Sequence, residues 1–368
     1  MNNTKQVFAK FSSSEIFLEQ GRLLFSLLHV FSKAGYQIKL FNNLHDKQLD
    51  KYGQLVYSLD GLELVDAPPA SAEGWLYLYD KEERAIGRRP WTKKVQIRFD
   101  LFAPFWFSNP LIMPFPMHPL QANIRAEQLE ECRSASRKMR IFFSGDTHQY
   151  RRTWVHYPST KLPRLPIVNA VMEGMGNAVL VISDPLVLDE LRNGAYTNQC
   201  VMTASSEVRI EPQDWLGTLA MADFFLSPPG IVMPMCHNII EAMAVGTIPI
   251  TNYPEWLDPQ LKHMENCIVF DDRDDLIAKM KQVIEMAPEE IARLRSNVID
   301  YYQTYMRPDT FIRRLEASAD REVPILMYTE RNMAKNPAKL GRHSILMQGT
   351  TVERDKNWFR RIASSLRS

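Results

Sequence analysis

Short apolar runs alternate with amphipathic segments along most of the chain. Residues 7–11 form such a run, a segment with apolar residues at helical spacing follows, and a second apolar run at 36–41 begins after Gly35. Ser12 and Glu15 fit a capping box at the start of the helix. The pattern predicts a strand, a helix and a second strand, which together open an α/β domain.

The same alternation predicts the elements that follow. In the first part of the chain we expect strands at 54–58, 75–79 and 95–99. Further along we expect strands at 140–144, 178–183, near 208, 224–227, 247–251 and 267–270, and helices at 167–174, 212–222, 238–245 and 274–287. Strands that alternate with helices favour parallel sheets covered on both faces. The expected fold class is therefore α/β, with two Rossmann-like domains that face each other across a cleft.

Changes in composition divide the chain into three parts. A charged stretch at 127–140, a helix or a linker, separates an N-terminal domain at 1–137 from a second domain at 138–325. A basic extension at 326–368 follows and can cross back to the first domain. Residues 101–119 are rich in proline and aromatic residues, which excludes a long helix and a central strand. We expect a loop there, either packed on the core or forming a wall for the acceptor in a cleft.

Charge and cysteine content exclude several classes of protein. The chain has 44 Lys and Arg against 43 Asp and Glu, so no strong overall field attracts nucleic acid. Residues 331–368 are basic, and this tail either packs as a terminal helix or contacts an anionic membrane surface. The four cysteines lack the paired spacing of zinc or redox sites. With no targeting segment and no long apolar run, we expect a cytoplasmic protein, or one peripheral to the membrane.

The most informative stretch is 223–253. A buried strand ends at Ser227, Gly230 follows after two prolines, and a helix that begins near Asn238 carries Glu241. Loops and helix N-termini at the carboxyl ends of strands present N–H groups to anions, so a nucleoside diphosphate would fit here. Glu241 lies among apolar neighbours and needs a hydrogen-bond partner, which a pair of ribose hydroxyls would supply.

Three short patterns in this stretch resemble the nucleotide-sugar-binding half of GT-B glycosyltransferases. They are Glu241-Ala242-Met243, Gly246 and Ile248-Pro249-Ile250. The strand at 141–145 is similar to the one that opens this half in exostosin-like enzymes of glycosyltransferase family 47, and the likeness extends over about 138–315. The resemblance implies a UDP-sugar or GDP-sugar donor and no separate cofactor. The donor-binding residues that we expect are Gly145, Ser227, Gly230, His237, Asn238 and Glu241.

The chain also departs from these patterns. Met233 stands where retaining enzymes often have a second Glu, which favours an inverting mechanism. Asn238 stands where exostosin-like proteins tend to have Arg, so its contact with the donor phosphate is in doubt.

Several further residues are candidates for chemistry. Arg151 and Arg152 either offset the charge of the leaving diphosphate in a metal-free enzyme or form an ordinary solvated or salt-bridged pair. Asp272-Arg273-Asp274 matches a metal-binding motif of GT-A enzymes, but its place before a helix favours capping, and we expect no metal site. The candidates for a general base are Asp100 and His118 in the first domain, with Asp146 and His148 across the cleft.

These observations together predict a metal-independent, inverting glycosyltransferase. Its partners would be a nucleotide-sugar donor and a glycan or lipid-linked acceptor in the synthesis of surface polysaccharide or glycoconjugate, and not a nucleic acid. Two alternatives remain open at this point. One is a nucleotide-sugar epimerase of similar architecture, and the other is a non-catalytic relative that binds a nucleotide or a glycan.

Overall fold

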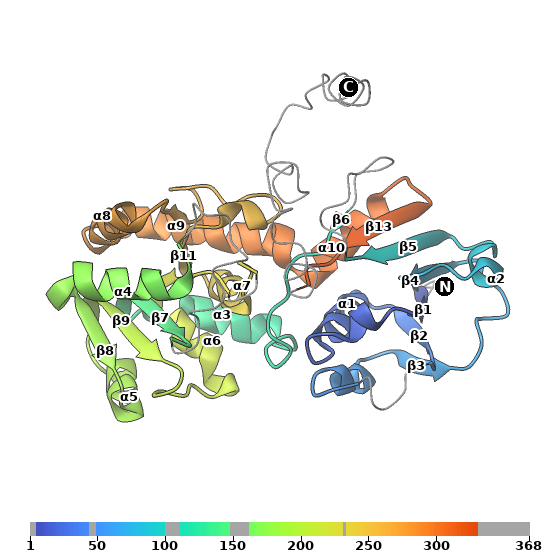
Figure 1. Cartoon of the computed structure of the whole chain (residues 1–368), viewed down its shortest axis with the longest axis horizontal. Helices are drawn as coiled ribbons and strands as arrows, with labels where there is room; N and C mark the ends of the chain where they lie inside the picture. The colour runs from blue at the N-terminus through green and yellow to red at the C-terminus, as the bar shows by residue number, and fades with distance from the viewer. Residues whose placement is uncertain (1–4, 44–48, 100–110, 148–161, 231–232, 330–368) are drawn as a thin grey trace, which may run out of the picture.

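The computed structural model describes residues 5–43, 49–99, 111–147, 162–230 and 233–329. These residues form two α/β domains, one built on a seven-stranded sheet and the other on a six-stranded sheet. In Figure 1 the first domain lies on the right and the second on the left. Every strand pair in both sheets is parallel. The expected fold class, two Rossmann-like α/β domains, is therefore confirmed.

The first sheet has the order β3-β2-β1-β4-β5-β13-β6. Its strands are β1 (Gln6–Lys10), β2 (Gln37–Phe41), β3 (Leu62–Val65), β4 (Trp75–Tyr79), β5 (Lys93–Arg98), β6 (Leu111–Ile112) and β13 (Glu322–Leu326). The order of the first five is that of a doubly wound sheet. Apolar residues of α1 (Arg22–Lys33) and α10 (Pro308–Ala317) cover one face. On the other face, near the short α2 (Arg84–Gly87), the rings of Phe8 and Tyr77 stack with Trp91.

The second sheet has the order β12-β11-β10-β7-β9-β8. Its strands are β7 (Met139–Gly145), β8 (Val179–Ile182), β9 (Thr197–Ala204), β10 (Ala222–Leu226), β11 (Ile248–Thr251) and β12 (Ile268–Val269). Its helices are α3 (Ala126–Ser134), α4 (Arg164–Gly174), α5 (Pro185–Asn193), α6 (Pro212–Ala220), α7 (His237–Ala244), α8 (Arg273–Ile284) and α9 (Pro288–Tyr301). The chain leaves β7 toward β8 and β9 but leaves β10 toward β11, so β7 and β10 flank a topological switch point.

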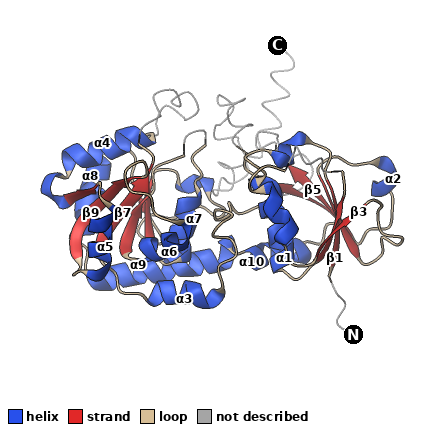
Figure 2. Ribbon diagram, turned by 90° about the horizontal axis from the view of Figure 1, so that it is seen from below, coloured by secondary structure: helices blue, strands red, loops and turns tan. Residues whose placement is uncertain are grey.

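The chain returns to the first domain earlier than its composition suggests. After α9 a π-helical stretch at Tyr302–Met306 leads into α10, which lies between the two sheets in Figure 2. Phe311, Ile312 and Leu315 of α10 are buried in the core that α1 also lines. The strand that follows, β13, inserts between β5 and β6. The expected range of the second domain, up to 325, therefore includes a helix and a strand that pack in the first.

Three local expectations are wrong. Residues 54–58 belong to a 3-10 helix at Gly53–Ser58 rather than a strand, with Val56 buried on its inner side. No strand forms at Val208, which follows a turn after β9 and fills the core from a loop. The expected helix after residue 12 is broken: Ser13 rather than Ser12 caps a 3-10 helix at Ser14–Phe17, and α1 begins only at Arg22.

Two other expectations can be checked at the ends of elements. Asp272 caps α8, because its Oδ1 accepts a hydrogen bond of 2.9 Å from the N–H of Asp275, as expected from the sequence. Within the loop expected at 101–119, residues 101–110 lie outside the described part of the chain. β6 is followed by residues 113–119, which form no helix or strand and run between the two domains.

Candidate functional site

The switch point of the first sheet is filled by a side chain of the protein itself. β1 and β4 are neighbours there, and Asp80 follows β4. Its Oδ1 accepts a hydrogen bond from the N–H of Ser12 (2.8 Å), and its Oδ2 accepts one from the N–H of Ser13 (2.6 Å). These N–H groups at the end of β1 would otherwise be available to a phosphate. The buried carboxylate of Asp80 therefore closes this position to an anionic ligand.

The switch point of the second sheet is built differently. Gly145 ends β7, and the loop from Ser227 to Gly230 follows β10. Ser227 is buried, with its Oγ 2.8 Å from the hydroxyl of Tyr253, so this side chain fixes the loop. A Cβ on Gly230 would lie 2.5 Å from the carbonyl oxygen of Met233, so only glycine fits at this position. Strand, loop and helix thus meet at this edge, where Asp146 is the first residue after β7 and the stretch from Ser227 to Gly230 carries no acidic side chain.

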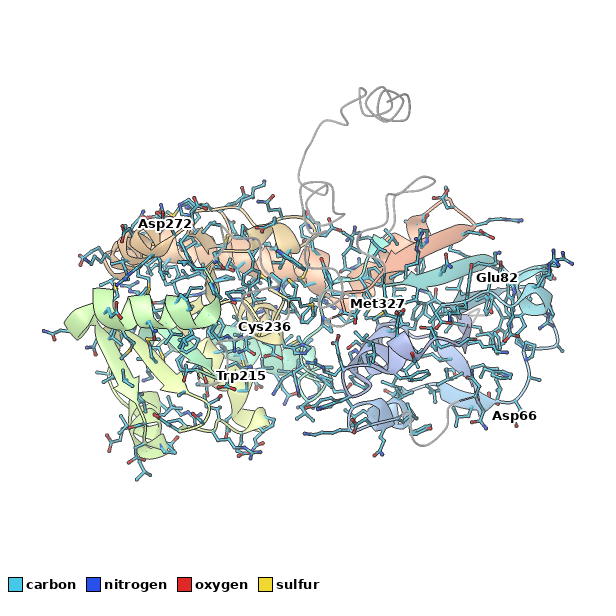
Figure 3. The ribbon with its side chains drawn as sticks, viewed as in Figure 1. Asp66, Glu82, Trp215, Cys236, Asp272 and Met327 are labelled. Atoms are coloured by element: carbon cyan, nitrogen blue, oxygen red, sulfur yellow. The ribbon has the colours of Figure 1, made fainter. Side chains whose placement is uncertain are left out.

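Helix α7 begins at this edge of the sheet. Cys236 is its N-cap and makes no side-chain capping bond, so the first-turn N–H groups of His237 and Asn238 are not capped by a side chain. The N-terminus of a helix carries partial positive charge. Figure 3 shows Cys236 and Trp215 in the second domain and Met327 on the side of the first domain. The start of α7 therefore faces the region between the domains.

His237 links this helix to the first domain. Its Nδ1 lies 2.7 Å from the carbonyl oxygen of Pro116, and its Nε2 lies 2.8 Å from Nη1 of Arg22. A carbonyl can only accept and a guanidinium can only donate, so Nδ1 carries the proton and the ring is neutral. Burial, together with the positive charge of Arg22, lowers the pKa of His237 to about 3.

A small recess that is open to solvent lies beside this contact. Its polar groups come from both domains: Glu19, Arg22 and Ser26 from the first, and His237 from the second. Apolar residues on its wall come from the segment after β6 and from the end of β13. Carboxylate, guanidinium, hydroxyl and ring groups beside apolar surface are the combination that binds a polar small molecule.

The turn before α1 brings Glu19 and Arg22 into the recess. Glu19, Gln20 and Gly21 have φ values of 59°, 61° and 75°, a conformation that side chains other than glycine rarely adopt. The carbonyl of Gln20 accepts hydrogen bonds from the N–H groups of Tyr52 and Gly53. A Cβ on Gly21 would lie 2.4 Å from the Cα of Gly53. Contacts from another part of the domain therefore hold a strained turn, as is common at functional sites.

Glu241 is 1% exposed and has a partner for each carboxylate oxygen. Oε1 accepts a hydrogen bond of 2.7 Å from the main-chain N–H of His118, and Oε2 accepts one of 2.6 Å from the indole N–H of Trp215. Burial raises the pKa of Glu241 to about 7, although both hydrogen bonds act in the opposite direction. The apolar surroundings expected for this carboxylate are present, and its partners here are groups of the protein.

The ring of His118 is also engaged. Its Nδ1 accepts a hydrogen bond from the N–H of Leu120 (3.3 Å), and its Nε2 lies 3.1 Å from the hydroxyl of Tyr52. Burial, with the charges of Arg22 and Lys51, lowers the pKa of His118 to about 4. With both nitrogens occupied, this ring has no free lone pair that could accept a proton from a substrate.

The structure brings some of the expected site residues together. Gly145, Ser227 and Gly230 lie at the carboxyl edge of the second sheet, and His237, Asn238 and Glu241 lie on α7. Asp146 follows β7 at the same edge. The candidates Asp100, His148, Arg151 and Arg152 lie outside the described residues.

Reasoning from the sequence missed Glu19, Arg22, Asp80 and Trp215. The one local signal for the first two is the polar triplet Glu19-Gln20-Gly21, which interrupts the helical spacing of apolar residues.

In the described ranges no three His, Cys, Asp or Glu side chains are grouped so that they could hold a metal ion. No helix within those ranges has the length and apolar content needed to cross a bilayer.

No family model matches the chain, and no curated protein matches its sequence. Among solved structures it is similar to HepE of Anabaena in complex with UDP, at 14% identity and a TM-score of 0.43, over 85% of this chain and 98% of that one. A glycosyltransferase of Rickettsia africae matches at 9% identity and 0.46 over 86% and 97%. A sucrose-phosphate synthase of Thermosynechococcus elongatus matches at 12% and 0.41 over 84% and 97%. At these identities and TM-scores the likeness by itself assigns neither family nor function.

Proposed function

We propose that this protein is a glycosyltransferase that moves a sugar from a nucleoside diphosphate to a glycan or lipid-linked acceptor. The observation that supports this most is the difference between the two switch points. Asp80 fills the first, whereas the second ends in a glycine loop and an uncapped helix beside a recess that both domains line. One domain then binds the donor, the other contributes the acceptor side, and the reaction takes place between them.

The diphosphate would bind where the loop that ends at Gly230 meets the start of α7. The first-turn N–H groups of α7, which no side chain of the N-cap residue binds, would donate to the phosphate oxygens. Arg22, whose Nη1 is 2.8 Å from the ring of His237, adds a cation from the first domain. A guanidinium can pair with two phosphate oxygens and stabilise the charge that develops on the leaving group. Arg151 and Arg152 are proposed for the same role, and Glu241 for the ribose hydroxyls.

We assign the role of general base to Glu19. Its carboxylate lines the recess beside Arg22, whose Nη2 lies 3.4 Å from Oε2, and both ring nitrogens of His118 are bound to other groups of the protein. In an inverting transfer the acceptor oxygen bonds to the anomeric carbon, and the bond from that carbon to the phosphate oxygen breaks. The acceptor proton passes to the base. Glu19 would take this proton on the side of the recess away from the second sheet.

The first test is nucleotide binding without added metal, with UDP, GDP, CMP and dTDP in thermal-shift and calorimetric titrations. We expect one nucleotide to raise the melting temperature, because a ligand that binds only the folded state stabilises it. Glu241→Gln should weaken this nucleotide about tenfold or more, since a charged hydrogen-bond acceptor is lost. Asp80→Asn is the matched control at the other switch point and should bind as wild type does. Binding of none of the four, or equal loss in both variants, contradicts the proposal.

The second test is turnover of the donor. A transferase releases nucleoside diphosphate faster when an acceptor is added, an epimerase forms an isomeric donor without one, and a non-catalytic relative leaves the donor intact. Glu19→Gln should abolish transfer but not donor binding, although donor affinity should change somewhat because Glu19 also pairs with Arg22. Glu15→Gln, an exchange of the same kind in the preceding 3-10 helix, should retain activity.

A further inference from the structure

Residues 113–121, which we call the strap, connect β6 of the first domain to the segment that leads into α3. In Figure 1 this part of the chain passes between the two domains. The strap is bound at three successive residues. The carbonyl of Pro116 accepts a hydrogen bond from His237, the Sδ of Met117 accepts one from the hydroxyl of Tyr302 (3.4 Å), and the N–H of His118 donates to Glu241. It therefore lies along α7, the helix proposed to bind the donor.

The contact between the strap and Glu241 excludes other ligands of that carboxylate. Glu241 is 1% exposed, and Oε1 and Oε2 each have a donor at hydrogen-bond distance. A ribose hydroxyl is also a hydrogen-bond donor and would approach the same oxygens. Although a carboxylate oxygen can accept two hydrogen bonds, the strap lies against Oε1 and leaves no access for a ribose hydroxyl while Glu241 is 1% exposed.

We propose that the strap is an internal competitor of the donor: the N–H of His118 takes the position of a ribose hydroxyl on Glu241, and donor binding displaces it. This inference rests on the proposed function of Glu241. The strap also connects the domains, as does the stretch from α9 to α10, so its displacement by the donor would alter one of the segments that join the two sheets.

Burial of Met113, Phe115 and Met117 opposes release of the strap, whereas its small number of main-chain donors favours release. Pro114, Pro116 and Pro119 have no main-chain N–H, so three donors that could fix the segment are missing. A segment with few main-chain hydrogen bonds opens at lower free energy than a strand or helix of the core. When the strap occupies the site in most molecules, the apparent affinity for the donor is the intrinsic affinity multiplied by the fraction of molecules in which the site is free.

The test compares two substitutions at one position. His118→Pro removes the N–H that donates to Glu241, whereas His118→Ala keeps it, and both remove the imidazole ring. We expect the proline variant to bind UDP or GDP at least about tenfold more tightly than the alanine variant, in line with loss of one hydrogen bond to a charged group. Equal affinity of the two variants overturns the proposal and leaves the proposed function in place.

A second measurement uses the wild-type protein and does not depend on the fold of the proline variant. Hydrogen exchange is followed on peptides that cover the strap and α7, with and without saturating UDP or GDP. We expect the amide of His118 to lose protection when nucleotide binds, while amides at the start of α7 gain it. Unchanged or increased protection of the strap in the bound protein overturns the proposal. Absence of nucleotide binding in the wild type and in both variants instead removes the proposed function, and this inference with it.

Discussion

Burial of Glu241 predicts a specific dependence of stability on pH. Its pKa is raised from 4.5 to about 7 by burial in the core of the second domain. The unfolded chain then loses this proton at lower pH than the folded protein does. The contribution of the group to stability is therefore fully present below about pH 4 and falls as the pH rises through 7. A difference of about 2.5 pKa units corresponds to about 3 kcal/mol.

Glu241→Gln removes the titrating proton and keeps the size of the side chain. The amide can accept from only one of the two donors, so the variant also loses a hydrogen bond, but this cost does not vary with pH. We therefore expect the free energy of unfolding of the variant, relative to wild type, to rise by about 3 kcal/mol between pH 4.5 and pH 8. The variant must be compared with wild type at each pH, because His29, His118 and His237 have lowered pKa values and make both proteins more stable as the pH rises.

The assay is urea unfolding at half-unit steps of pH, followed by tryptophan fluorescence for both proteins. A difference between wild type and variant that stays constant from pH 4.5 to 8 would refute the reasoning, because Glu241 would then titrate as an ordinary carboxylate. A difference that falls with pH would mean that the two hydrogen bonds outweigh burial.

Three further substitutions, with Gly217→Ala as a control for the first, test other parts of the structure by urea unfolding. Gly230→Ala should destabilise the protein by about 1–3 kcal/mol, because its Cβ would meet the carbonyl of Met233. Gly217→Ala in α6, whose Cβ would have no atom within 4 Å, should stabilise it by about 0.5–1 kcal/mol. Equal effects of the two substitutions would contradict this. Asp80→Asn should cost about 1.5–3 kcal/mol, since a charged acceptor of two N–H groups is lost, and an unchanged stability would speak against it. As the pH falls from 6.5 toward 3, wild type should lose about 4 kcal/mol more of its free energy of unfolding than His237→Gln does, because the unfolded chain binds the proton first. An equal loss in the two proteins would contradict a lowered pKa of His237.

Elements whose signal is local could be predicted from the sequence. The strand expected at 75–79 coincides with β4, and α7 lies within one residue of the expected helix at 238–245. The apolar periodicity of such segments directly reflects which face is buried. The short helix at Gly53–Ser58 contains apolar residues but too few positions to separate a strand from a helix. Its conformation follows from contacts with the turn before α1.

Long-range features could not be predicted in the same way. Nothing local to α10 and β13 indicates that they pack in the first domain, because their partners α1 and β5 lie more than two hundred residues earlier. The partner of Glu241 raises the same difficulty. Its neighbours in sequence reveal that the carboxylate is buried, but the donors His118 and Trp215 come from other elements. The strained turn at Glu19 exists only because another segment holds it.

The two carboxylates beside the sheets illustrate why Glu241 indicates function more strongly than Asp80 does. Asp80 binds two adjacent main-chain N–H groups that would otherwise lack partners, so its charge directly stabilises the end of β1. Glu241 lies in an apolar core with two donors that fail to offset its burial, since its pKa remains raised. A neutral side chain of similar size would avoid this cost above pH 7. A group that lowers stability at neutral pH, on a helix with an uncapped N-terminus near a recess between domains, is typical of a position set by ligand binding rather than by folding.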